Sequence, residues 1–337
     1  VRAEAKKFAW TKVDFTITPY GILWANMTYE TQRTNTGDYV LYVYPPDPDD
    51  DPRFLVDGRM TRIGLDVAGP RIPLFCCAQS GGKVEIDFTR NLDTENRASI
   101  LLRHAYLEVK NEEFRLLFGQ TWDVISPLYP GVLMYSVGWG GGNIGYRRAQ
   151  FRGERYLDCS DSLLLTLQAC VARDVPSLSD TVSGVTYDMA PWPVIETRVG
   201  TTWGPRGPGC LPWEFGFSGH IGQTNYDYAS PPWPTRIAED PLKTWSINAD
   251  FRIPLTHWCG VQGEFFHGAN LGTFFGGIIQ SVDFGTPANP GTGDVIRSTG
   301  GWIDFWVDLT PRLHTHFGYS IDDPYNRDLT SGRTYNQ

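Results

Sequence analysis

The sequence predicts an all-β chain that forms a transmembrane antiparallel up-and-down β-barrel. Three observations support this prediction: strands with two-residue alternation, connections that are alternately short and long, and the lack of any apolar run of 18 residues. The 337 residues include 36 glycines, 24 prolines and 12 tryptophans, as expected for many short strands joined by turns. Without a long apolar run, and so without a transmembrane helix or signal peptide, such a chain can cross a bilayer only as a closed barrel.

The strands are identified by apolar residues that alternate with charged or polar ones. Residues 1–12 are basic, and we expect them to be the end of a periplasmic N-terminal extension, with the barrel occupying residues 13–337. About thirteen strands can be recognised, beginning at 13–28, 57–68, 83–89, 101–109 and 114–119, continuing after residue 143 and around 163–168, 195–199, 214–221, 245–252, 260–266 and 303–308, and ending at 314–321.

The connections between these strands alternate in length. Links at 110–113, 157–161, 254–257 and 309–311 are short, and those at 69–82 and 204–212 are moderate. The intervening links are long, at 30–56, 120–144, 173–192, 224–241 and 268–297, with 90–97 as a short exception. This pattern is typical of outer-membrane barrels, which have short periplasmic turns and long outer loops, whereas a soluble sandwich has no reason to keep it.

The polar face of the strands is rich in charges of both signs. A charge that faces lipid costs roughly 2–4 kcal/mol at the middle of the bilayer, so these residues must face water. A solvated sandwich would also satisfy them, and the connection pattern favours the barrel. The expected lumen wall therefore contains Arg62, Asp66, Glu85, Asp87, Glu196, Arg198, Asp250, Arg252 and Asp304.

The segment 120–143 is apolar and aromatic but has neither strand nor helix period. We expect it to fold into the lumen as a constriction loop, with Gln120, Trp122, Asp123, Tyr129, Tyr135 and Trp139 near the narrowest point. Arg148 and Arg152 follow the loop directly and are expected on the adjacent wall. They could contact permeating solutes, since arginines favour anions, or they could pin the loop through ion pairs.

Cysteines, histidines and carboxylates give no pattern that predicts an enzyme, a cofactor or a metal site. Cys76, Cys77, Cys159, Cys210 and Cys259 fall at the short-turn end and are candidates for one or two periplasmic disulfides. His314 and His316 lack a third ligand, and GWGGGNIG lacks the Lys-Ser/Thr of a phosphate-binding loop. The net charge of −9 argues against a nucleic-acid partner.

The runs LLRHAYLEVK, FGQTW, PLYPGVLMY and GGGNIGYRRAQ resemble the DcaP-like outer-membrane porins, over the central quarter of the chain. This resemblance implies a trimeric barrel of sixteen strands that passes small anionic solutes, including dicarboxylates, through an arginine-lined constriction. It implies that Gln120, Trp122 and Asp123 form the root of the constriction loop and that Arg148 and Arg152 lie on the basic wall. The chain departs from the family in ending at GRTYNQ, without a terminal aromatic strand, so we expect the last strands, about three, to be missing.

The sequence thus favours an outer-membrane porin of a diderm bacterium, embedded in outer-membrane lipid as a homotrimer. We expect it to pass small hydrophilic solutes, including anionic ones that resemble dicarboxylates. The first alternative is a structural or interaction barrel of the envelope whose loops bind a partner protein. The aromatic loops at 231–234 and 270–277 could serve either the porin or this alternative. The second alternative is a secreted all-β carbohydrate-binding domain.

Overall fold

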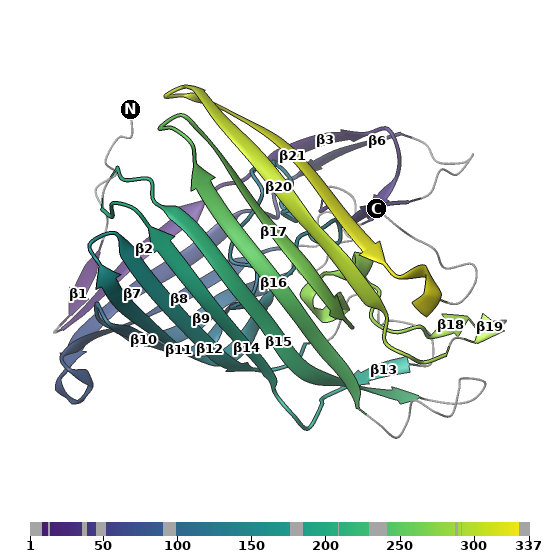
Figure 1. Cartoon of the computed structure of the whole chain (residues 1–337), viewed down its shortest axis with the longest axis horizontal. Helices are drawn as coiled ribbons and strands as arrows, with labels where there is room; N and C mark the ends of the chain where they lie inside the picture. Colours follow the sequence, from purple (N-terminus) through teal and green to yellow (C-terminus); the bar gives the residue numbers. More distant parts are fainter. Residues whose placement is uncertain are drawn as a thin grey trace.

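The computed structural model describes residues 9–12, 14–35, 39–44, 52–89, 99–175, 185–207, 209–228, 241–286, 289–290 and 292–329. Its main feature is one antiparallel sheet whose strands follow one another in chain order (Figure 1). The path contains β1 (Trp10–Lys12), β2 (Phe15–Ile22), β7 (Arg62–Ile72), β8 (Ala78–Asp87), β9 (Leu101–Lys110), β10 (Phe114–Trp122), β11 (Arg147–Ser160), β12 (Leu163–Ala172), β14 (Val194–Trp203), β15 (Trp213–Tyr228), β16 (Leu242–Pro254), β17 (Cys259–Ala269), β20 (Arg297–Thr310) and β21 (Leu313–Pro324).

The remaining elements are short and lie in the long connections. The strand β13 (Val185–Asp188) pairs with the end of β15. Two-stranded ribbons are formed by β3 (Asn26–Glu30) with β6 (Arg53–Asp57), by β4 (Thr34–Asn35) with β5 (Tyr42–Val43), and by β18 (Gly285–Thr286) with β19 (Asn289–Pro290). Four 3-10 turns are η1 (Pro73–Phe75), η2 (Gly272–Phe274), η3 (Gly277–Ile279) and η4 (Asn326–Asp328). No helix among the described residues is long and apolar enough to cross a membrane.

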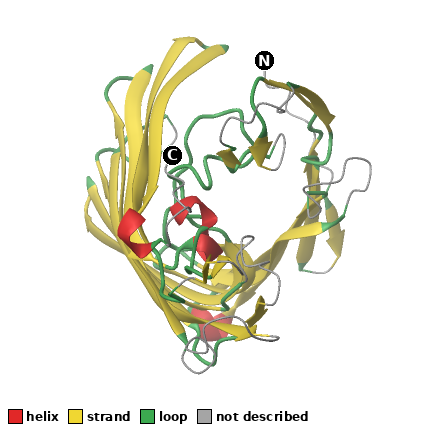
Figure 2. Ribbon diagram, turned by 90° about the vertical axis from the view of Figure 1, so that its right-hand side faces the viewer, coloured by secondary structure: helices red, strands yellow, loops and turns green. Residues whose placement is uncertain are grey.

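The predicted all-β, up-and-down architecture is confirmed, and the sheet curves around an interior that holds several loops (Figure 2). Fourteen strands lie on the path rather than the thirteen expected, because Trp10–Lys12 forms a strand against β2 inside the segment expected to be an extension. Among the described residues, the edge strands β1 and β21 each pair with one neighbour only. Short and long connections alternate as predicted, with the tight turns of β9–β10, β11–β12, β16–β17 and β20–β21 at one end.

The two faces of the sheet differ in the way that the strand alternation predicts. Phe118, Phe217 and Leu107 on the outer face are 67%, 71% and 71% exposed, whereas Glu196 and Asp87 on the inner face are 0% exposed. A soluble protein would bury such an apolar face, since large exposed apolar patches favour association or lipid contact. No second sheet packs face to face against it within the described part of the chain, so the architecture is not a soluble β-sandwich.

Candidate functional site

The connection between β10 and β11 forms a loop, residues 123–146, that folds into the interior. Its two ends are tied together, because the backbone N–H of Asp123 donates to Tyr146 O and the Asp123 carboxylate accepts the N–H of Tyr146, both at 2.8 Å. Arg148 Nε donates to the same carboxylate at 2.8 Å. The two ends of the loop therefore lie side by side where they join the wall, and we call this junction of Asp123, Tyr146 and Arg148 the neck of the loop.

Beyond this neck, backbone N–H groups of the loop donate to carboxylates of three wall strands, β14, β17 and β20. Val124 N donates to Glu196 of β14 at 2.6 Å. Leu128 N donates to Glu264 of β17 at 2.7 Å. Gly131 N donates to Asp304 of β20 at 2.9 Å. Since charged acceptors make the stronger hydrogen bonds, these three carboxylates fix the loop across the interior.

The loop then reaches the opposite wall through Tyr135. The hydroxyl of Tyr135 accepts from Arg62 of β7 and from Arg103 of β9, each at 3.0 Å, and donates to Asp87 of β8 at 2.9 Å. Arg103 also pairs with Glu85 at 2.6 Å and with Asp87 at 2.7 Å. One loop thus contacts the wall on both sides of the interior.

A second loop, residues 270–296, also folds inward and packs against the first. Gly277 N and Ile278 N both donate to Asp322 of β21 at 3.0 Å. Phe274 is fully buried, with its ring centroid 3.9 Å from that of His220 and 3.8 Å from the guanidinium carbon of Arg148. The apolar residues of 270–277 are buried inside the barrel, so in this structure the segment does not present them to a partner protein. The loop at 231–234 lies outside the described residues.

The two inward loops share apolar clusters with each other and with a third connection, the one between β2 and β7. One cluster joins Val124, Ile125 and Ile144 of the first loop to Leu271 and Phe274 of the second. Another joins the first loop's Tyr135 and Trp139 to residues of the other two loops, namely Tyr39, Leu41, Met60, Phe275 and Ile279. Apolar burial therefore holds the three loops together as one unit inside the sheet.

The residues expected near the narrowest point fall into two groups. Trp122, Tyr129, Tyr135 and Trp139 belong to the interior, where the Trp122 ring lies 5.4 Å from Tyr129 and 5.8 Å from Trp139. Gln120 does not join them. It shares the outer-face parity of Phe118 on β10, and its amide donates to Leu102 O at 2.5 Å.

Arg148 is sealed under the loop, whereas Arg152 is largely buried beside the root of the loop and lines a small interior cavity with Trp122 and Tyr129. Arg148 is 0% exposed and is surrounded by Asp123, Glu196 and Asp174, at 2.8, 3.8 and 4.0 Å. Arg152 is 7% exposed and donates to Gln150 at 2.9 Å and to the carbonyl of Trp122. The placement of Arg148 corresponds to the pinning alternative, whereas Arg152 forms its ion pair with Glu154 of its own strand, at 3.4 Å.

The other wall charges are mostly paired with charges on other wall strands, either on the adjacent strand or on the next but one. Arg198 donates to both oxygens of Asp250, at 3.0 and 2.6 Å. Lys83 lies 3.2 Å from Asp66, whose side chain is 55% exposed. Arg252 is exposed, with its guanidinium carbon 5.5 Å from the Trp306 ring centroid. The carboxylates Glu85, Asp87, Glu196, Asp250 and Asp304 are all less than 9% exposed.

Sequence reasoning missed Arg103, which is central to the contacts of Tyr135. The register between β8 and β9 shifts at Glu85 and Ile86, and both Arg103 and His104 are buried as a result. A β-bulge places consecutive residues on one face, so strict alternation cannot identify both. Glu264 and Asp322 were also missed, although each follows the inward parity of its strand. The second inward loop carried a usable signal, the run LGTFFGGII, which is as apolar as the first loop.

The expected disulfides are absent. All six cysteines are free: Cys76, Cys77 and Cys159 are exposed, Cys210 is intermediate, and Cys170 and Cys259 are buried. Cys76 and Cys77 adopt positive φ angles of 52° and 56° in the turn after η1.

Comparison with solved structures places the fold among outer-membrane proteins. The outer membrane channel DcaP of Acinetobacter baumannii matches with a TM-score of 0.69 and 16% identity, over 94% of this chain and 80% of that one. OprB of Pseudomonas putida (TM-score 0.44, 13% identity, 94% and 76% coverage) and a loop L8 deletion mutant of OmpT of Vibrio cholerae (0.42, 12%, 93% and 95%) match too weakly to support an inference. No family model and no curated protein matches the sequence. The similarity to DcaP shows that this chain has the fold of an outer-membrane β-barrel channel.

Proposed function

We propose that the protein is a porin of the outer membrane of a diderm bacterium, which allows passive diffusion of small hydrophilic solutes. The observation that carries this proposal is the 123–146 loop, which is bonded to both walls inside a sheet that is polar within and apolar outside. Such a loop narrows an aqueous passage without closing the barrel, which is how wide barrels select by size. The loop is therefore the constriction, with Asp123 and Arg148 at its neck.

We further propose a preference for anions, including dicarboxylate-like solutes. The wall carboxylates are buried and bonded to loop amides or to arginines, so their charge is largely compensated. Arg252 remains exposed, and Arg62 makes no ion pair with any residue that the structure describes. Uncompensated guanidinium groups on a polar wall attract anions. Arg62 and Arg252, rather than the buried and ion-paired Arg148 and Arg152, supply this preference.

The test is planar-bilayer conductance of the full-length protein extracted in detergent, with the reversal potential measured in a salt gradient. Stepwise openings with a reversal potential on the anion side would support both proposals. Stepwise openings without anion preference would leave the porin and remove the role of the arginines. Protein that is soluble without detergent would contradict the membrane location.

A second candidate is a barrel with mainly an architectural role in the envelope, bound to a partner protein. It is favoured by the interlocking of three loops, which fills a large part of the interior with apolar side chains. This candidate would be favoured if the protein shows no conductance in planar bilayers although it is folded, as judged by heat-modifiable migration on gels. For either role we propose a homotrimer, because the outer face exposes enough large apolar side chains to support both lipid and protomer contacts.

A further inference from the structure

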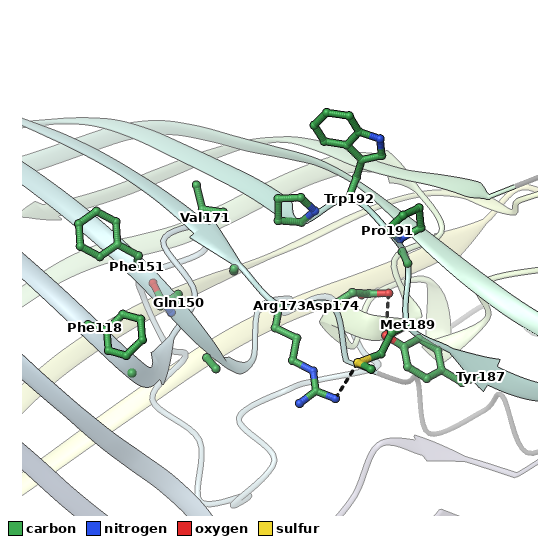
Figure 3. A pocket seen from close by; sticks show the side chains of 15 residues that line it. Phe118, Gln150, Phe151, Val171, Arg173, Asp174, Tyr187, Met189, Pro191 and Trp192 are labelled. Atoms are coloured by element: carbon green, nitrogen blue, oxygen red, sulfur yellow. Dashed lines mark hydrogen bonds between the residues drawn. The ribbon is translucent and has the colours of Figure 1, made fainter.

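The outer face of the sheet carries a groove beside the ends of β10, β11 and β12 that lead into long loops. The segment 187–193 descends along this face and encloses a cavity of about 530 Å³ against the strands. Figure 3 shows Phe118, Phe151 and Val171 along one side and Trp192 standing over the other. The three strand residues are 67%, 54% and 47% exposed, so the groove is continuous with the apolar outer face.

Small residues keep the groove open between the aromatic rings. Gly119 and Ala149 contribute almost no side chain to its lining. Gly119 has a φ of 131°, and a Cβ at this position would collide with the carbonyl oxygen of Ala105. The backbone therefore requires glycine here, and the hollow cannot be filled by a larger residue at this point.

A cation lies at the rim of this apolar groove. Arg173 follows β12 directly, and its guanidinium donates to the Met189 sulfur at 3.3 Å, which is a weak acceptor. It makes no ion pair with any residue in the described ranges. The neighbouring Asp174 is turned inward, where it accepts from the Tyr187 hydroxyl at 3.1 Å and lies 4.0 Å from Arg148. The guanidinium of Arg173 thus contacts the weakly accepting thioether of Met189, at a position where an anion would form a stronger interaction.

We propose that this groove binds an acyl chain of an anionic phospholipid, with the lipid phosphate paired to Arg173. The inference rests on the proposed membrane location, since the groove opens onto the face that contacts the bilayer. A single lipid supplies both an apolar chain that can contact Phe118, Phe151 and Val171 and an anionic headgroup that can pair with Arg173. This matches a groove with an apolar lining and a cation at its rim. The cavity volume is within the range of small-molecule sites, and arginine forms bidentate bonds with phosphate.

The test is native mass spectrometry of the full-length protein in detergent, titrated with phosphatidylglycerol or with phosphatidylcholine of the same acyl chains. Two variants alter the groove: Arg173→Gln removes the cation, and Ala149→Phe fills the hollow. Two matched controls lie on the outer face outside the groove lining. Arg155→Gln removes an arginine that pairs with Glu113 at 2.7 Å near the opposite end of β11, and Ala169→Phe adds a ring to the exposed face of β12.

We expect wild-type protein to bind phosphatidylglycerol at a saturable site in preference to phosphatidylcholine. Arg173→Gln should weaken the phosphatidylglycerol adduct about fivefold, the effect of one basic residue near an anionic lipid, and Ala149→Phe should remove it. Both controls should bind like wild type. Equal phosphatidylglycerol adducts in the wild type and all four variants would overturn the proposal. A separate variant with a photo-cross-linking residue at position 149 tests for a protomer contact. A cross-link from this position to a second copy of the chain would assign the groove to that contact and would also overturn the proposal.

Conductance of the same samples separates this inference from the proposed function. The groove is outside the barrel, so Ala149→Phe should conduct like wild type. Normal conductance without selective lipid binding would refute the lipid site alone. Selective lipid binding by a barrel that does not conduct would refute the porin proposal alone.

Discussion

Arg148 and Arg62 both contact the 123–146 loop from the inner wall, but their surroundings differ. Arg148 on β11 is completely buried and has three carboxylates within 4.0 Å. Arg62 on β7 is only partly buried and is held by one neutral group, the Tyr135 hydroxyl, which lies 3.0 Å away and whose ring centroid is 4.9 Å from the guanidinium carbon. Arg148 is therefore surrounded by more negative charge than its own positive charge can balance, whereas Arg62 has no counter-charge among the described residues.

This difference shows that strand parity alone does not decide what an inward charge does. Parity selects the face, and the loop then decides which residues of that face remain in contact with water. Burial of Arg148 is tolerable only because carboxylates surround it, and those carboxylates depend on it in turn. Arg62 has no such dependence, so its charge is free to act on solutes in the lumen.

Removal of the Arg148 charge should have the largest effect. Arg148→Met would leave Asp123 and Glu196 buried without their cation, and we expect a loss of about 3–5 kcal/mol in the free energy of unfolding. Arg62→Met removes the hydrogen bond and the cation–π contact with Tyr135 and should cost about 1 kcal/mol. Urea titration in lipid vesicles, followed by the gel shift of the folded barrel, measures both. Equal costs would contradict the contrast between the two arginines.

Three carboxylates surround the single cation of Arg148, and a substitution of Asp174 tests whether the third carboxylate destabilises the folded state. Burial raises the pKa of the Asp174 carboxyl to about 6, against an ordinary value of 3.8, in spite of the nearby Arg148. Because the folded pKa is the higher one, the folded state binds the proton more tightly, and its stability falls as the pH rises through this window. Asp174→Asn removes this penalty and keeps a side chain that can accept from Tyr187.

We therefore expect Asp174→Asn to be more stable than wild type above pH 6, by at most about 3 kcal/mol for a shift of this size. The two proteins should be equally stable below pH 4, where both side chains are neutral. Thermal unfolding at several pH values between 4 and 7 measures the difference. A variant that is less stable than wild type at pH 7 would show that Asp174 is a needed partner of Arg148.

The fold was largely predictable because its signals are local. Alternation over a few residues and the lengths of connections identified the strands, their order and their outer face. The exceptions arise where local rules break, as at the bulge that buries both Arg103 and His104. Trp10–Lys12 was missed as a strand because three residues are too few to show a period.

The candidate site was only partly predictable because it depends on contacts between distant segments. The apolar run at 120–143 predicted an inward loop, but Leu128 and its partner Glu264 are 136 residues apart in sequence. Nothing local indicates which wall carboxylate receives which loop amide. For the same reason, the sequence left open whether Arg148 pins the loop or faces the lumen, and Gln120 was assigned to the interior although its strand turns it outward.

The carboxylates that receive loop amides should differ from those that pair only within the wall. Glu264→Gln removes a charged acceptor from Leu128 N–H, and we expect a loss of about 1–3 kcal/mol in loop attachment. Conductance should become larger and noisier as the loop detaches. Glu108→Gln is the matched control, because the partners of Glu108 within the described ranges are Lys110 and Arg115 of the wall. An equal increase in noise for both variants would refute loop anchoring by Glu264.

The smallest effect should come from the charge that we place in contact with solutes. Arg62→Gln should lower the ratio of anion to cation permeability roughly two- to fivefold, as expected for an interaction of about 0.5–1 kcal/mol between charges in water. Arg148→Lys retains the buried cation and should leave this ratio unchanged. The reversal potential in a salt gradient measures both, and the Arg62 effect should shrink at high salt because lumen charges are screened. If Arg148→Lys shifts the reversal potential more than Arg62→Gln does, then the buried arginine controls ion selectivity. In that case, burial under the 123–146 loop does not determine which wall charges act on solutes.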